Sequence, residues 1–131
     1  MIEINRLIRY AKSHKEGFSI NVKNDKIRKI KATKNKRYIV AGLTLIEIYE
    51  DHYFFYSQNL KLLNFNNNIG GYYNEKLKCY QIELILVLRY KSDAIETGKR
   101  YKQISIYDLL EEREIFLNDK ITPVVYKQGP I

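Results

Sequence analysis

Residues 78–89 read KCYQIELILVLR, with apolar or aromatic side chains alternating through Tyr80, Ile82 and Leu84. From residue 84 to residue 88 the alternation stops and every side chain is apolar. A period of two is typical of a strand with one buried face, and a wholly apolar run is typical of a strand buried on both faces. The segment therefore predicts a long strand with one end covered on both sides.

Shorter segments with strand character lie on both sides of this one. They cover residues 18–22, 38–41, 44–49, 53–56, 69–73 and 103–109, and turn-forming residues separate most of them. Residues 43–63 are apolar enough to form a helix instead, and that alternative stays open. The segments together predict a mostly antiparallel sheet.

Two segments have helical character. In residues 2–16, Ile4, Leu7, Ile8 and Ala11 recur at helical spacing, and Gly17 follows as a stop. A second helix is expected from an N-cap at Ser92 to about residue 101. The predicted fold class is α+β, with an N-terminal helix, a mostly antiparallel sheet and one helix packed across the sheet before the last strand.

The length of 131 residues suits one compact domain, which we expect at residues 1–117, followed by an irregular tail at 118–131. The longest uninterrupted apolar run, at 84–88, is far too short to cross a membrane. We expect no secretory signal from the pattern of the first residues. Cys79 is the only cysteine, so no internal disulfide can form. We therefore expect a cytoplasmic protein.

Positive charge is concentrated in one segment. Eight of the fifteen residues from 23 to 37 are basic and one is acidic, so this segment supplies +7 of the net charge of +8. Such a local cluster is typical of a surface that attracts nucleic acid or another polyanion. We expect it to form a long loop or hairpin, with Tyr38 available to stack on bases. The candidate binding residues are Lys23, Lys26, Arg28, Lys29, Lys31, Lys34, Lys36, Arg37 and Tyr38.

Other polar groups have structural interpretations. Asp108, which shares a strand with Gln103 and Tyr107, is either a functional carboxylate or, as we favour, the cap of the following turn. Residues 50–52 are expected to form a turn and not an acid–base site, and residues 70–71, both glycine, to support a bulge or a twisted edge. Residues 111–114 predict a solvated acidic turn, or a contact with the basic segment of a second copy in a homodimer. No pattern predicts a catalytic group, a metal site or a cofactor.

Several short motifs occur in a fixed order. They are Gly17-Phe18-Ser19-Ile20, Ile69-Gly70-Gly71-Tyr72-Tyr73-Asn74, Tyr80, Asp93-Ala94 and Gln103-Ile104-Ser105-Ile106-Tyr107-Asp108-Leu109. The order resembles a group of short hypothetical proteins of phages and integrative elements, although Tyr72 stands where that group has Trp. The resemblance covers roughly half of the chain and implies a phage or mobile-element origin, but no activity.

These observations predict a non-enzymatic phage or mobile-element protein that engages a host protein or nucleoprotein complex through its basic segment. An inhibitor of a host defence system, such as an anti-CRISPR protein, is the sharpest form of this hypothesis. One alternative is a module that binds DNA or RNA directly in replication or transcription. The other alternative is a virion assembly protein. None of these needs a membrane or a cofactor.

Overall fold

The structure is a computed structural model that describes residues 2–117. Its helices and strands are α1 Ile4–Lys12, β1 Phe18–Asn21, η1 Lys23–Asp25, β2 Arg28–Lys29, β3 Tyr38–Ile48, β4 Tyr53–Phe55, α2 Ser57–Leu60, η2 Lys61–Asn64, β5 Asn68–Asn74, β6 Cys79–Leu88, α3 Lys91–Arg100, β7 Ser105–Asp108 and β8 Arg113–Phe116. The tail expected at 118–131 lies outside the described residues.

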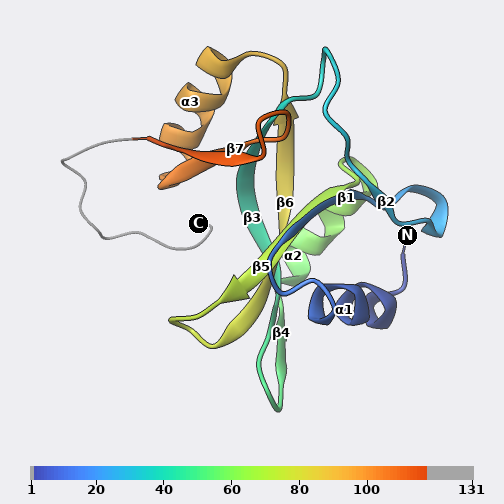
Figure 1. The fold of residues 1–131 in the computed structure, drawn as a ribbon. Coiled ribbons are helices and arrows are strands. Elements are labelled where there is room, and N and C mark those ends of the chain that lie inside the picture. Colours follow the sequence, from blue (N-terminus) through green and yellow to red (C-terminus); the bar gives the residue numbers. More distant parts are fainter. Residues whose placement is uncertain (1, 118–131) are drawn as a thin grey trace. The chain divides into compact units, whose positions relative to one another are not determined.

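The strands belong to one eight-stranded sheet, with α1 before it in the sequence and α3 before its last strands (Figure 1). The strand order is β2-β1-β5-β6-β3-β7-β8, and β4 pairs with β3 outside this path. The strands pair antiparallel in the hairpins β1–β2, β3–β4, β5–β6 and β7–β8. The α+β class predicted from the sequence is confirmed.

The described residues fall into two compact units. The first unit contains residues 2–30 and 43–84, and the second contains residues 31–42 and 85–117. Strands β3 and β6 are each divided between the two units. Each unit has its own hydrophobic cluster and is described separately below.

In the first unit, the apolar face of α1 is buried as its spacing predicts. Leu7, Ile8 and Ala11 are buried in a cluster with side chains of the strands, among them Ile20 and Ile69. The N-terminal helix is thus confirmed. Gly17, which follows α1, has a φ of 122°, a backbone conformation that favours glycine over any residue with a side chain.

Close packing explains why residue 71 is a glycine. A Cβ atom on Gly71 would lie 2.5 Å from Cζ of Phe18, which is its register partner on β1, and 3.0 Å from the carbonyl oxygen of Gln81 on β6. Gly71 therefore lets the Phe18 ring cover β5, and its role here is structural.

In the second unit, α3 packs on β7. Ala94 is buried, and a Cβ atom on Gly98 would lie within 3.0 Å of side-chain atoms of Ile106 and Leu117, so the helix approaches closely. The cap expected at Ser92 is wrong: Tyr90 is the N-cap residue, and no side chain caps the helix. The reason is that Tyr90 is the last extended residue, so the helix begins one residue before Ser92.

Three further segments differ from the expectation. The alternative of a helix at 43–63 is wrong, since residues 38–48 form a single strand and 53–55 another, but the short turns α2 and η2 at 57–64 were not expected. The strand expected at 103–109 covers only 105–108. The acidic segment at 111–114 was expected to be a turn, but its last two residues begin β8. This strand pairs with β7, and Ile115 packs against the hydrophobic cluster of the second unit.

Adding a methyl group at Gly71 should destabilise the protein. We expect Gly71→Ala to lower the free energy of unfolding by about 1–3 kcal/mol, because the ring and the carbonyl must move apart. Urea unfolding of the variant and the natural chain measures this difference. The same substitution in a Phe18→Ala background is the control and should cost less, whereas equal costs in both backgrounds would contradict the packing argument.

Candidate functional site

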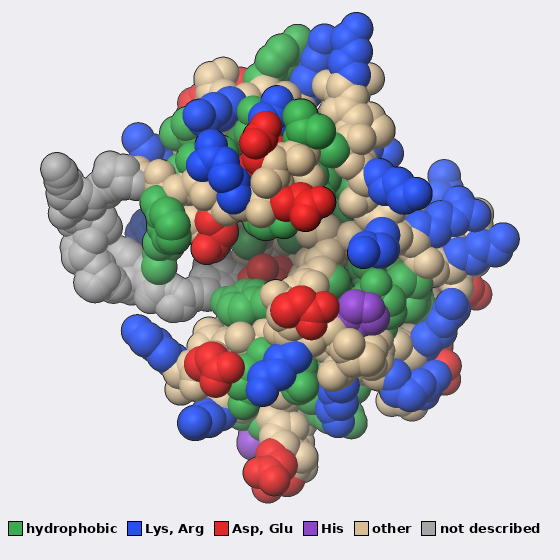
Figure 2. Space-filling model, in the orientation of Figure 1, with side chains coloured by type: hydrophobic (Ala, Val, Ile, Leu, Met, Phe, Trp, Pro, Cys, Tyr) green, Lys and Arg blue, Asp and Glu red, His purple; other side chains and the backbone are tan. Residues whose placement is uncertain are grey.

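The basic segment is divided between the two units. Residues 23–30 belong to the first unit, where η1 and β2 carry them, and residues 31–37 belong to the second. Figure 2 shows Lys and Arg side chains gathered over η1 and β2. Lys23, Lys26, Arg28 and Lys29 are all exposed there, while Ile27 packs against the cluster of the first unit.

In the second unit, the rest of the segment forms a loop that leads into β3. Thr33 and Lys36 bridge the loop, with the Thr33 amide donating to the Lys36 carbonyl at 2.9 Å. The loop ends at Arg37, whose amide donates to the carbonyl of Leu88 at 3.1 Å and whose carbonyl accepts from the amide of Leu109 at 2.8 Å. The loop is therefore tied to the end of β6 and to the end of β7.

A basic depression opens beside this loop. Its volume is about 570 Å³. Its lining residues are Ala32, Thr33, Lys34, Arg37, Tyr38, Arg89, Tyr90, Lys91 and Leu110. We call this depression, which lies wholly within the second unit, the basic pocket. Its lining, as far as the described residues go, contains four cationic side chains, two tyrosines and no carboxylate.

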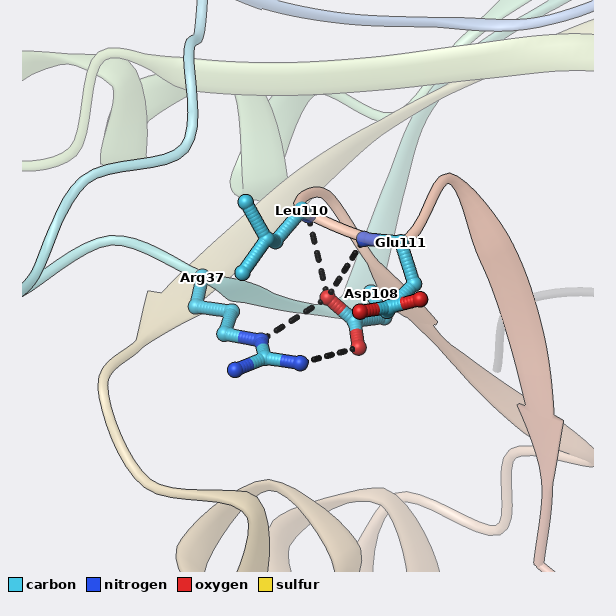
Figure 3. A network of polar contacts seen from close by, with 4 residues as sticks. All are labelled: Arg37, Asp108, Leu110 and Glu111. Carbon is cyan, nitrogen blue, oxygen red and sulfur yellow. Dashed lines mark hydrogen bonds and ion pairs between the residues drawn. The ribbon is translucent and has the colours of Figure 1, made fainter.

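Arg37 is held by a buried carboxylate. Its Nε and Nη2 donate to the two carboxylate oxygens of Asp108 at 3.0 and 2.9 Å, and Figure 3 shows this bidentate ion pair. The Asp108 side chain is 3% exposed and also accepts from the amides of Leu110 and Glu111. The expected role of Asp108 as a turn cap is confirmed, and the pair compensates the positive charge of Arg37.

The same contacts set the titration of Asp108. The hydrogen bonds from Arg37, together with those from the turn amides, lower the pKa of Asp108 to about 2. The ionised form is thus preferred more in the folded chain than in the unfolded one. The stability that this gives is complete above an unfolded pKa of about 4 and is lost as the pH falls through 2.

Three other cations of the basic pocket are not compensated in this way. Lys34, Arg89 and Lys91 form no ion pair with any carboxylate in the described part of the chain. The Arg89 guanidinium carbon lies 4.9 Å from the ring centre of Tyr90, which is a cation–π contact. Tyr90 remains 54% exposed, so one cation and one aromatic ring are presented to solvent together.

Tyr38 is placed differently from the expectation. Tyr38 is only 6% exposed and belongs to the hydrophobic cluster of the second unit, with the Arg37 guanidinium carbon 5.0 Å from the centre of its ring. The ring is thus part of the floor of the basic pocket. Sequence reasoning missed residues 89–91, although the order Arg-Tyr-Lys at the end of an apolar strand was a visible signal.

The start of α3 adds to the positive potential of the basic pocket. Tyr90 and Lys91, the N-cap and first residue of the helix, both line the pocket. The first backbone N–H groups of a helix lack partners within it and carry a partial positive charge. No side chain caps them here, although Asp93 in the first turn opposes part of the potential.

The first unit contains a partly buried network of polar side chains. Glu47 Oε1 accepts from the hydroxyls of Tyr49 and Tyr56, at 3.3 and 3.1 Å. Glu47 Oε2 accepts from Gln81 Nε2 at 3.1 Å, and Gln81 Oε1 accepts from the Tyr72 hydroxyl at 2.8 Å. The network joins β3, β5 and β6 with the N-cap of α2, so it holds the polar face of these strands together.

Glu83 lies two residues beyond Gln81 on β6 and points to the same face. It is 4% exposed, and its Oε2 has no hydrogen-bond partner within residues 2–117. Burial raises the pKa of Glu83 to about 8, so the side chain is mostly protonated at neutral pH. The sequence did not reveal this group, because the carboxylate falls in an otherwise strand-like alternation.

The remaining candidates form no reactive cluster. His52 Nδ1 lies 2.8 Å from Asp51 Oδ1 in the connection between β3 and β4, which confirms the turn expected at 50–52. Within the described chain, no group of three or more His, Cys, Asp or Glu side chains could hold a metal ion. Among the same residues, no helix is long and apolar enough to cross a membrane.

Comparisons with protein-family models, curated proteins and solved structures found no match to this chain. The resemblance to phage and mobile-element proteins therefore stays a prediction. So does the homodimer contact expected from residues 111–114, of which Glu114 accepts a hydrogen bond from Ser105 within the β7–β8 hairpin.

The buried Glu83 should make stability depend on pH. Folded Glu83 keeps its proton up to about pH 8, whereas in the unfolded chain it ionises near its ordinary pKa of 4.5. Between these values the folded chain binds more protons, so the free energy of unfolding falls as the pH rises. Glu83→Gln cannot ionise, so its stability relative to the natural chain should rise between pH 5 and pH 8, by on the order of 2–4 kcal/mol.

Urea unfolding of both proteins at pH 5, 6, 7 and 8 measures this difference. Glu114→Gln, in the exposed β7–β8 hairpin, is the control and should leave the pH profile unchanged. Parallel profiles for the natural chain and Glu83→Gln would show that Glu83 is not held protonated.

Proposed function

We propose that this protein is a non-enzymatic binding protein whose ligand is nucleic acid, held at the basic pocket of the second unit. The observation that carries the proposal is the grouping of Lys34, Arg89 and Lys91 around one depression, where none of them pairs with a carboxylate of residues 2–117. Phosphate groups are the anions that such a cluster suits, because lysine supplies a point charge and arginine a planar fork.

The backbone and the rest of the surface support the same proposal. The uncapped start of α3 offers N–H groups beside Lys91, an arrangement that favours anions. In the first unit, the exposed cations of η1 and β2 raise the local concentration of polyanions whether or not they touch them. The proposal places the protein in the cytoplasm of its host cell, and the phage or mobile-element origin rests on the sequence resemblance alone.

Reversing the charge of the basic pocket should remove most of the binding. We expect the triple variant Lys34→Glu, Arg89→Glu, Lys91→Glu to bind a fluorescent 12-nucleotide DNA at least tenfold more weakly at low salt. For the natural chain, three phosphate contacts give a loss of about 20- to 40-fold in affinity between 50 and 200 mM salt. Fluorescence anisotropy titrations measure both quantities.

The matched control reverses three exposed lysines outside the basic pocket, Lys61, Lys76 and Lys99, and so has the same net charge. It should keep most of the affinity of the natural chain. If the two triple variants bind nucleic acid equally well, the net charge of the protein and not the basic pocket determines the affinity. If the natural chain binds no nucleic acid at 20 mM salt, the proposed function is wrong.

A second candidate function is the capture of a host protein or nucleoprotein complex, as an inhibitor of a defence system would do. The observation that favours it is the β3–β4 hairpin of the first unit, where four consecutive aromatic residues, from Tyr53 to Tyr56, are exposed. Among the strands that the structure describes, β4 pairs only with β3, so it is an edge strand of the described sheet. Exposed aromatic groups and free strand edges are typical of protein interfaces.

A pull-down separates this candidate from direct nucleic-acid binding. We expect a tagged natural chain to retain a specific host protein after nuclease treatment at moderate salt, and Phe54→Ser, Phe55→Ser to lose it. The control is the charge-reversed triple variant of the basic pocket, which should retain that protein. Recovery of nucleic acid alone, lost on nuclease treatment, would contradict the second candidate.

A further inference from the structure

We infer that the ligand of the basic pocket is single-stranded nucleic acid, with an unpaired base against Tyr90 and Leu110 and the adjoining phosphates at Lys34, Arg89 and Lys91. The inference rests on the proposed function and narrows it. Its basis is that the basic pocket combines cations with exposed apolar surface. Phosphate groups would contact the cations but not the apolar surface.

The ring of Tyr90 is available for stacking. It is 54% exposed, and the Arg89 guanidinium lies against it with a cation-to-centroid distance of 4.9 Å. Its backbone is fixed, because the Tyr90 carbonyl accepts from the Ala94 amide at 3.1 Å as α3 begins. An aromatic ring beside a cation, on a backbone held in place, is the arrangement on which unpaired bases stack in single-strand binders.

Leu110 provides a second apolar group. It is 58% exposed in the turn between β7 and β8, and its amide donates to Asp108 Oδ1 at 3.0 Å. Asp108 is held in turn by Arg37, so the ion pair on the floor of the basic pocket also fixes the turn that carries Leu110. An exposed leucine at a fixed position among cations suits a ligand with an apolar face as well as negative charge.

The shape of the ligand follows from this combination. A duplex presents its phosphates outward and keeps its bases stacked inside, so Tyr90 and Leu110 would stay unused. A single strand offers a base and a phosphate in each nucleotide. The volume of about 570 Å³ is within the range of sites that hold a small organic ligand, so a base with its sugar and phosphate has room.

The test compares a single strand with one ligand that lacks bases and one that keeps its bases stacked inside a duplex. Anisotropy titrations of the full chain would use a 12-nucleotide single-stranded DNA, an abasic strand with the same number of phosphates, and a 12-base-pair duplex. We expect the natural chain to bind the strand with bases about tenfold more tightly than the abasic strand. Tyr90→Leu should remove most of this preference and leave the salt dependence of abasic binding unchanged.

Two controls keep the result interpretable. Tyr101→Leu changes another exposed tyrosine of the same unit, outside the basic pocket, and should keep the preference. Tyr90→Phe keeps the ring and should also keep it. In the natural chain, photo-crosslinking to a strand with 4-thiothymidine should modify residues 89–91, and this readout does not depend on whether a variant folds.

The outcomes distinguish this inference from the proposed function. If the abasic strand, the duplex and the strand with bases bind equally per phosphate, and Tyr90→Leu has no effect, the inference is overturned while nucleic-acid binding at the basic pocket stands. If none of the three ligands binds at low salt, both fail. Cross-links found only at residues 23–29 would overturn the assignment to the basic pocket.

Discussion

The ion pair between Arg37 and Asp108 fixes most of what surrounds the basic pocket. Its two hydrogen bonds join the residue before β3 to the last residue of β7. The backbone of Arg37 adds bonds to Leu88 at the end of β6 and to Leu109. Three strand ends therefore meet at one side chain and its backbone, and the residues that line the basic pocket continue from those ends. Breaking a largely buried pair leaves an uncompensated charge, so the arrangement resists change on either side.

This pair also changes the meaning of the sequence pattern. Arg37 is one of the eight basic residues that define the basic segment, yet its charge is matched by a carboxylate 71 residues away. Tyr38, expected to stack on bases, is instead buried beneath it. The exposed ring and the uncompensated guanidinium come from Tyr90 and Arg89, which carry no charge run to mark them. Local charge density therefore marks the segment that leads into the basic pocket, but the exposed ring and the unpaired guanidinium of that pocket lie outside the segment.

The sequence predicted the parts of the fold that depend on a local period. The helix at 4–12 and the strands around residues 44–48 and 79–88 follow from regular spacing of apolar groups, which the core of each unit preserves. It also predicted the cap made by Asp108, because that role involves amides only two and three residues away. It missed β8, whose exposed and charged residues gain strand structure only from pairing with β7. The order Arg-Tyr-Lys at residues 89–91 is a local signal, but the meeting of these residues with residues 32–38 in one pocket depends on contacts across more than fifty residues, which no local pattern reports.

If the basic pocket binds nucleic acid as proposed, its three cations give weak binding at physiological salt, because each phosphate contact contributes mainly through the release of counterions. One stacked base adds a salt-independent share, but a single nucleotide is a small ligand. Tight binding then needs a second contact on the same ligand or complex, since two linked contacts reinforce each other through a high effective concentration. The first unit carries two surfaces suited to a second contact: the cations of η1 and β2, which suit a polyanion, and the exposed aromatic hairpin, which suits a protein. Their chemistry differs, so the salt dependence of the complete interaction distinguishes them: the first steepens it, whereas the second adds affinity that salt does not remove.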